Sequence, residues 1–299
     1  SYLPAQERPV VFLGPYEHHS NELPWRESIA DVVSIPLCEN GQIDVACLQR
    51  ELSVYADRPL LIGSFSAASN VTGIRSDVVG ISRILKEHGA LVFWDYAAAA
   101  PYVGIDMNGE TPIDAVFISP HKFIGGPGTP GVLIAKKAIL NNSVPATVGG
   151  GTVLYVTPQS HRYIEDHERR EEGGTPAIIE SIRAGLVFKL QREVGTAEIE
   201  KREHDYAQRA LAYFNALPNL EIMGGVEASR LSIMSVQVKH GGKDLHYSFV
   251  VSLLNDLFGI QVRGGCSCAG PYGHSLLGID MEKSNAIEKE IAKGSTVLR

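Results

Sequence analysis

Short apolar runs alternate with helix-like stretches in the first half of the chain, and this alternation constrains the fold more than any other feature. Four runs are rich in branched and aromatic residues, as strands buried on both faces are. They lie at residues 10–13, 60–63, 91–94 and 115–118. Residues 77–88 have apolar side chains at helical spacing and end before a glycine. The pattern predicts an α/β fold, with a mainly parallel sheet flanked by helices and a site at the carboxyl ends of the strands.

The second half of the chain has a different pattern. A helix-like tract over residues 178–217 is continuous enough to connect two domains. Beyond it, residues 231–238 alternate like a half-solvated strand, and residues 245–258 have a helical pattern. We therefore predict a large domain over residues 1–190 and a smaller α+β domain over residues 191–299.

The composition excludes several classes of protein. With a net charge of −7 and no long basic run, the chain lacks the electrostatic footprint of nucleic-acid binding. No apolar segment is long enough to span a bilayer, and four cysteines in 299 residues argue against a disulfide framework. We expect a cytoplasmic protein without nucleic-acid or membrane partners. We also expect the chain to be trimmed at both ends, because a β-like run follows Ser1 almost at once and residues 297–299 resemble the start of a strand.

A glycine-rich segment follows the strand expected at residues 115–118. Residues 119–131 read Ser-Pro-His-Lys-Phe-Ile-Gly-Gly-Pro-Gly-Thr-Pro-Gly, which puts Lys122 at the carboxyl end of that strand. A lysine packed there loses solvation, which lowers its pKa and makes its amine a nucleophile. A surface lysine beside a glycine-rich turn is the alternative. A nucleotide-binding phosphate loop is excluded because the Gly-Lys-Ser/Thr ending is missing.

This segment resembles the Ser-x-His-Lys-x-x-Gly-Pro-x-Gly-x-Gly motif of class V aminotransferases and cysteine desulfurases, with one extra residue here. The resemblance implies a transferase of fold type I that depends on pyridoxal 5'-phosphate (PLP). Lys122 would hold PLP as a Schiff base, and Ser119 and His121 would hydrogen-bond its phosphate. Residues 17–25 resemble the family's Glu-His-His element, in which His18 would stack on the pyridine ring. Alone, two adjacent histidines are a surface pair or a weak metal site.

Two polar residues after neighbouring strands fit the same family. Asn70, in Ser-Asn-Val-Thr-Gly, would contact the phenolic oxygen of PLP, and Asp95 would keep the pyridine nitrogen protonated so that the ring withdraws electrons. In isolation both would be ordinary turn or cap residues. The chain departs from the family at Ala98, where desulfurases carry a glutamine that also bonds the phenolic oxygen. This departure leaves the type of reaction open.

Two glycine-rich segments further along resemble family elements. They are residues 149–151, Gly-Gly-Gly, and residues 171–176, Glu-Glu-Gly-Gly-Thr-Pro. The threonine of the second element reaches the phosphate of the partner subunit's cofactor in the family. By resemblance, Thr175 implies a homodimer with a shared active site. Read by itself, the segment is a loop before a helix that accepts Pro176 in its first turn.

The last motif, residues 263–271, resembles the Arg-x-Gly-x-x-Cys-Ala loop that carries the persulfide-forming cysteine of desulfurases. Spacing from Arg263 assigns this role to Cys268, whose thiolate would attack the sulfur of the substrate. Cys266 is not part of the pattern. Together with His274 it suggests zinc, but a fourth ligand at fitting spacing is not evident, so we expect no metal site. Ordinary loop cysteines are the other interpretation.

The resemblance extends over residues 10–271 and predicts an enzyme that acts on an amino-acid substrate. Our first hypothesis is cysteine desulfuration, with Lys122, Cys268 and His18 as catalytic residues. An aminotransferase or another PLP lyase is the alternative. A catalytically inactive PLP-fold protein that binds a partner is a third hypothesis, since Ala98 replaces the glutamine. In addition, the family's phosphate-binding turn and its substrate-binding arginine would lie outside the chain.

Overall fold

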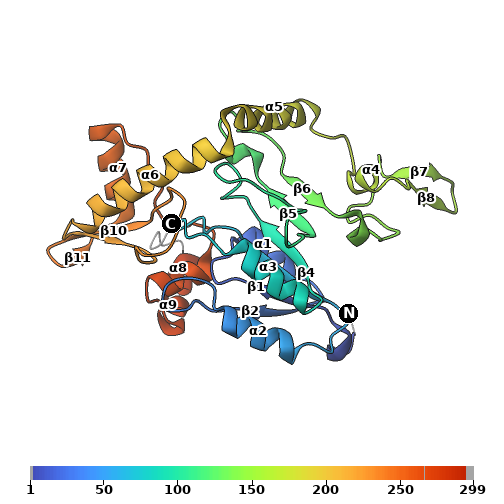
Figure 1. Ribbon diagram of the computed structural model, residues 1–299, viewed down its shortest axis with the longest axis horizontal. Coiled ribbons are helices and arrows are strands. Elements are labelled where there is room, and N and C mark those ends of the chain that lie inside the picture. Colours follow the sequence, from blue (N-terminus) through green and yellow to red (C-terminus); the bar gives the residue numbers. More distant parts are fainter. Residues whose placement is uncertain (1–2, 266, 294–299) are drawn as a thin grey trace.

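A six-stranded sheet forms the centre of the molecule (Figure 1). In the computed structural model, which describes residues 3–265 and 267–293, the strand order is β2-β1-β3-β4-β5-β6. The first five are parallel, and β6 is antiparallel to β5. Their bounds are Val10–Leu13 (β1), Asp31–Ser34 (β2), Leu61–Ser66 (β3), Leu91–Asp95 (β4), Ala115–Ile118 (β5) and Val132–Ala135 (β6). The expected mainly parallel α/β sheet is confirmed.

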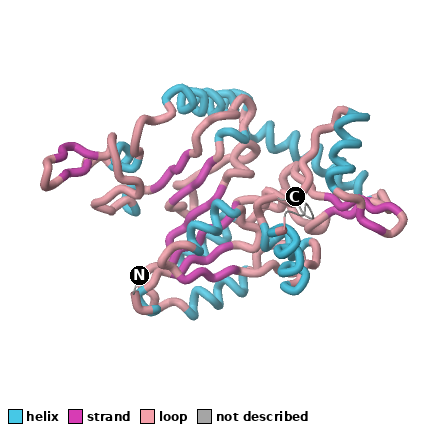
Figure 2. The backbone as a smooth tube through the Cα atoms, turned by 180° about the vertical axis from the view of Figure 1, so that it is seen from behind, coloured by secondary structure: helices cyan, strands magenta, loops and turns pink. Residues whose placement is uncertain are grey.

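Helices surround the sheet and continue beyond it, as the view from behind also shows (Figure 2). They are α1 (His19–Arg26), α2 (Val45–Val54), α3 (Val78–Glu87), α4 (His167–Glu171), α5 (Ile178–Val194), α6 (Thr196–Asn215), α7 (Tyr247–Phe258), α8 (Gly270–Leu276) and α9 (Met281–Ala292). Short 3₁₀ turns cover Ala5–Glu7 (η1), Pro120–Lys122 (η2) and Lys137–Ile139 (η3). The helix expected at residues 77–88 is α3, with Asp77 as its N-cap.

Alternate residues of β1 belong to different cores, because successive side chains of a strand point to opposite faces. Phe12 lies in one core with Leu48 of α2 and Leu85 of α3. Leu13 lies in the other, against which Trp25 of α1 packs. Both faces of the sheet are therefore covered, which explains why most residues of its central strands are apolar.

The helical tract expected over residues 178–217 is two helices rather than one. Gly195, at φ 91° and ψ 122°, separates α5 from α6. This backbone conformation lies outside the helical region and is accessible mainly to glycine, so the chain changes direction there. The expectation of a single continuous helix was wrong.

The expected strand at residues 231–238 is also displaced along the chain. Only its last part is a strand, β10 (Val236–His240), which pairs with β9 (Leu220–Ile222) and β11 (Lys243–Asp244). Leu231 is instead buried in the main core, where its N–H donates to the carbonyl of Gly73. Because this part of the chain packs against the large sheet, its sequence alternation does not mark a free-standing strand.

Of the remaining segments, one projects from the sheet and another joins its core. The hairpin of β7 (Val153–Val156) and β8 (His161–Tyr163) makes a projecting arm with α4 (Figure 1). Ala269 and Tyr272, from the start of α8, join the core of the large sheet. The division at residue 190 stays a prediction. The strand expected at residues 297–299 lies outside the described residues.

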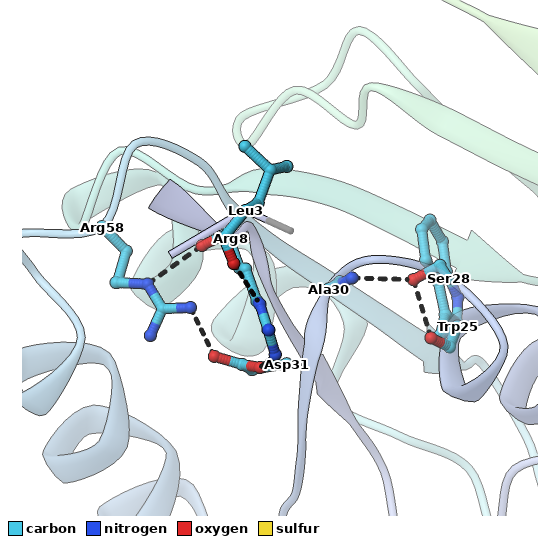
Figure 3. Close-up of polar contacts among 7 residues, drawn as sticks. All are labelled: Leu3, Arg8, Trp25, Ser28, Ala30, Asp31 and Arg58. Atoms are coloured by element: carbon cyan, nitrogen blue, oxygen red, sulfur yellow. Dashed lines mark hydrogen bonds and ion pairs between the residues drawn. The ribbon is translucent and has the colours of Figure 1, made fainter. Parts of the chain in front are cut away.

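An ion pair fastens the amino-terminal edge of the sheet (Figure 3). Arg58 donates to Asp31 at the start of β2 and to the carbonyl of Arg8 just before β1. The hydrogen bond from Arg58 holds the pKa of Asp31 below its ordinary value. Within residues 3–265 and 267–293, no helix has both the length and the apolar character needed to cross a bilayer.

Candidate active site

The carboxyl ends of three adjacent parallel strands bring Asn70, Asp95 and Lys122 to one edge of the sheet. Asp95 is the last residue of β4, Lys122 lies in η2 just after β5, and Asn70 lies in the turn after β3. Asp95 and Lys122 shift each other's pKa, so their charges interact directly. The expected gathering of polar residues at this edge is present.

Asp95 is a buried carboxylate with few protein partners. Its Oδ1 atom accepts a hydrogen bond of 2.7 Å from the N–H of Ala97, and the residue is 9% exposed. Burial raises its pKa, while that hydrogen bond and the charges of Lys122 and His18 oppose the rise. Such a group is stabilised by a positive charge brought next to it.

Lys122 has the electrostatic surroundings of a reactive amine. Although the residue is exposed as a whole, desolvation lowers its pKa; Arg263 adds to this effect, and Asp95 opposes it. The tight turn after it requires glycine, since a Cβ on Gly126 would lie 1.9 Å from the carbonyl oxygen of Pro120. The glycine-rich segment thus shapes the backbone around the lysine.

His18 stands at the start of α1, facing the same charges. Its Nδ1 atom accepts a hydrogen bond of 3.1 Å from the N–H of Ser20 and so caps the helix. Desolvation lowers its pKa, the charge of Lys122 lowers it further, and Asp95 opposes both. A half-buried, neutral imidazole is therefore favoured beside Lys122 and Asp95.

Glu17, immediately before His18, is the centre of a buried polar network. It is 4% exposed and accepts four hydrogen bonds. The donors are Gly14 N at 3.2 Å, Asn21 Nδ2 at 2.7 Å, Ser66 N at 2.9 Å and Ser66 Oγ at 2.7 Å. Ser66 is the register partner of Asp95 in the sheet. Glu17 thus joins the His18 segment to the strand edge that carries Asp95.

Glu17→Gln is expected to change how stability depends on pH. Burial raises the pKa of Glu17 from 4.5 to about 7. As the pH rises from 4.5 to 7, the unfolded chain releases this proton first, so the native protein loses stability that it has at lower pH. The variant lacks this loss, so its stability should rise relative to the unchanged protein by up to about 3 kcal/mol between pH 5 and 8.

Urea unfolding at the two pH values measures this difference. Glu87→Gln, at an exposed position of α3, is the matched control. A stability difference that is the same at pH 5 and pH 8 would mean that the four donors keep Glu17 ionised throughout.

The loop of residues 267–270, here named the Cys268 loop, lies against the same edge of the sheet. Asn70 Nδ2 donates to the carbonyl of Ser267 at 2.7 Å, and the N–H of His19 donates to the carbonyl of Cys268 at 2.7 Å. The Oδ1 atom of Asn70 is buried and has no hydrogen-bond partner among the residues that the structure describes. Cys268 is half-buried, while Cys266 lies outside the described residues.

The other expected site residues are more exposed than Asn70 and Asp95 or have fewer contacts with the site. Ser119 is half-buried and His121 is exposed, both within the turn that carries Lys122. Thr175 is exposed, in the loop between α4 and α5. The two glycine-rich elements do meet, since the N–H of Gly174 donates to the carbonyl of Gly150. Ala98, in the position of the family's glutamine, is buried.

The sequence did not indicate a role in the site for two residues at this edge of the sheet. Glu17 and His19 were seen only as letters of a motif, yet both connect segments of the site. For Glu17, the only indication in the sequence was an acidic residue shortly after an apolar strand.

Residues 3–265 and 267–293 bring together no cluster of three or more His, Cys, Asp or Glu that could hold a metal ion.

A lysine and a buried carboxylate at the carboxyl edge of a mainly parallel sheet define the class of PLP-dependent proteins of fold type I. Within this class, the family model for aminotransferase class-V matches residues 4–281, and the chain belongs to that family. The expected family is therefore confirmed.

Curated relatives agree with this assignment. A probable cysteine desulfurase of Halalkalibacterium halodurans is 32% identical over 265 residues, which cover 87% of this chain and 62% of the relative. One from Staphylococcus aureus is 27% identical over 271 residues, covering 89% and 63%. The chain thus spans less than two thirds of the length of these relatives.

Solved structures have the same fold. An apo cysteine desulfurase from Thermococcus onnurineus matches with a TM-score of 0.77 at 25% identity, covering 97% of this chain and 74% of that one. The cysteine desulfurase CsdA from Escherichia coli matches with a TM-score of 0.80 at 24% identity, covering 92% and 66%. The expected transferase fold of type I is confirmed.

The family is PLP-dependent, and the residues at the sheet edge fit that cofactor. Asn70 offers a buried oxygen without a partner among the described residues, as a polar ligand would require. Asp95 offers a buried carboxylate and Lys122 an amine of lowered pKa. The amide of Asn70 suits the ring hydroxyl of PLP, the carboxylate of Asp95 suits its pyridine nitrogen, and the amine of Lys122 suits its aldehyde.

Proposed function

We propose that the protein is a PLP-dependent cysteine desulfurase. The observation that carries this proposal is the contact of the Cys268 loop with Asn70 and His19, which brings a cysteine-bearing loop to the Lys122 edge of the sheet. The relatives named as probable cysteine desulfurases support it. A cysteine on a loop beside a PLP site suits desulfuration, whereas an aminotransferase has no use for a nucleophilic thiol.

The residues would hold the cofactor as follows. Lys122 would hold it covalently through its amine, and Asp95 would pair with the pyridine nitrogen. Asn70 would contact the phenolic oxygen, and His18 would stack on the ring. Ser119 and His121, which share the turn with Lys122, would bind the phosphate, and Thr175 of a second copy would complete the phosphate site.

PLP, when bound, supplies an electron-withdrawing ring that stabilises negative charge at the substrate. The rest of the chemistry belongs to protein groups. The Lys122 amine, neutral more readily because its pKa is lowered, takes a proton from the substrate and returns one. The buried Asp95 carboxylate would pair with the pyridine nitrogen and keep it protonated. His18, favoured in its neutral form, adds no competing positive charge there.

The sulfur is transferred to Cys268. The Cys268 thiolate attacks the substrate sulfur, a sulfur–sulfur bond forms, and the bond between that sulfur and the β-carbon of the substrate breaks. The electron pair of the broken bond stays on the substrate, which gains a proton and leaves as alanine. Two external thiols then reduce the persulfide: the outer sulfur leaves as sulfide, the two thiols are oxidised to a disulfide, and the Cys268 thiol is regenerated.

The test is the conversion of L-cysteine to alanine by the purified, PLP-loaded protein. We expect alanine and thiol-releasable sulfur in equal amounts, together with a change in the visible absorbance when L-cysteine is added. An amino-group transfer to a keto acid without sulfur release would replace this proposal by an aminotransferase. No spectral response at all would favour an inactive protein of the same fold.

We further propose that the protein is a homodimer. The outer face of α5 exposes a row of large apolar residues, and so does the β7–β8 hairpin. They are Ile178, Ile179, Ile182, Leu186 and Leu190 on α5, and Leu154, Tyr155 and Val156 on the hairpin. The opposite face of α5 packs on the Lys122 turn, where Phe188 contacts Phe123. A second copy covering this apolar face would border the active site, which supports the role of Thr175.

A double variant tests the dimer. Ile182→Asp with Leu186→Asp would bury two charges without partners, and we expect the dimer to weaken by at least about 100-fold. Sedimentation equilibrium measures this, and Val79→Asp, at an exposed position of α3, is the control that should stay dimeric. If the unchanged protein, the double variant and Val79→Asp associate equally, α5 is not part of the dimer interface.

Cytoplasmic location and a small-molecule partner complete the proposal. Four cysteines in 299 residues are too few for a disulfide framework, which supports a reducing compartment.

A further inference from the structure

The Cys268 loop has a backbone conformation that must be held in place by contacts. Cys268 has φ 56°, and among residues 3–265 and 267–293 no other residue except glycine has a positive φ. An L-residue avoids this region by roughly 1 kcal/mol. Contacts elsewhere in the site therefore have to stabilise the loop.

His19 makes two of these contacts, one on each side of the Cys268 peptide. Its backbone N–H donates to the carbonyl of Cys268 at 2.7 Å, and its Nε2 atom accepts from the N–H of Gly270 at 2.9 Å. A Cβ on Gly270 would lie only 3.1 Å from Nε2, so the loop passes closely over the imidazole. Asn70 adds the third contact, through the carbonyl of Ser267.

We propose that His19 is a positioning residue that holds Cys268 in place for sulfur transfer. This inference rests on the proposed desulfurase function and assigns His19 a role separate from that of His18, which belongs to the cofactor. Nε2 is the acceptor in this contact, so the contact requires that Nε2 carry no proton. The His19 imidazole contacts the Cys268 loop and affects sulfur transfer only through the position of Cys268. The neighbouring His18 faces Lys122 and Asp95.

Three substitutions separate the side-chain contact from the rest of the residue. His19→Gln keeps an acceptor, since the Oε1 atom of glutamine reaches about as far from the backbone as Nε2. His19→Asn has an acceptor that reaches only as far as Nδ1, and His19→Ala has none. The backbone N–H of residue 19 remains in all three, so the bond to Gly270 is tested alone.

The first measurement needs no activity. We expect iodoacetamide to alkylate Cys268 about fivefold faster in His19→Ala and His19→Asn than in the unchanged protein, the factor allowed by the loss of one ordinary hydrogen bond. His19→Gln should restore the slow rate. Fragment-ion mass spectrometry separates Cys268 from Cys266, alkylation of Cys38 provides the internal reference, and thermal unfolding verifies the fold. His204→Ala, at an exposed position of α6, is the histidine control.

The second measurement uses the PLP-loaded protein. Persulfide formation on Cys268 in a single turnover of L-cysteine should slow in His19→Ala and His19→Asn and recover in His19→Gln, while the spectral response to L-cysteine stays the same. Equal alkylation in all variants, or a glutamine variant as reactive as the alanine variant, would overturn the role of His19. Absence of alanine from the unchanged protein would overturn the desulfurase function alone, because alkylation still decides the contact.

Discussion

Replacement of Lys122 by alanine is expected to lower alanine formation from L-cysteine by at least about 10⁴-fold. The lysine is the one residue of the proposed mechanism that both binds the cofactor and moves protons, so both contributions are lost together. Its lowered pKa, caused first by desolvation, equips it for both. The visible absorbance of covalently held PLP should also be absent from the dialysed variant.

Lys122→Arg separates the charge from the nucleophile. Arginine keeps the positive charge next to Asp95, but its guanidinium group does not act as a nucleophile at neutral pH. It should be as inactive as the alanine variant. Lys137→Ala, in the exposed turn η3, is the matched control and should retain full turnover. Retention of a tenth or more of the activity by Lys122→Ala would exclude Lys122 as the lysine that holds PLP.

Cys268→Ala is expected to lower alanine formation by at least about 10³-fold, while the spectral response to L-cysteine remains. The thiol is needed only when the carbon–sulfur bond breaks, so the earlier steps at Lys122 and Asp95 do not depend on it. Stopped-flow absorbance and a single-turnover assay of alanine measure the two parts separately.

Two matched cysteine variants complete this experiment. Cys38→Ala removes a half-buried thiol that bonds to Asn40, far from Lys122 in the chain, and should leave turnover unchanged. Cys266→Ala determines which cysteine of the Cys-Ser-Cys segment carries the sulfur. Loss of activity in this variant alone would transfer the role from Cys268 to Cys266. Full turnover in Cys268→Ala would leave the alternative of another PLP lyase.

Four strands of the central sheet, β1, β3, β4 and β5, were predictable because their information is local. Each run of branched and aromatic residues marks one of these strands, and burial on both faces favours apolar residues at most positions. The candidate site was predictable for a related reason. In parallel strands the carboxyl ends share one edge, so Asn70, Asp95 and Lys122 had to converge.

The two failures have different causes. The tract over residues 178–217 has good helical composition on both sides of Gly195, yet it is interrupted there by a backbone conformation that is accessible mainly to glycine. Leu231 alternates with its neighbours as a strand residue would, but it is buried in the main core next to Gly73. That second outcome depends on a contact with a distant part of the chain and not on the segment alone.

By itself, the sequence determined the fold class and the family and singled out Lys122 as the candidate lysine, because strand composition and motif spacing are properties of neighbouring residues. Only the tertiary structure decided the connections that organise the site. Glu17 and Ser66 are 49 residues apart, and His19 and Gly270 are 251 apart. These pairs become hydrogen bonds only after the sheet has brought their segments together, since a buried donor or acceptor finds its partner in space and not along the chain.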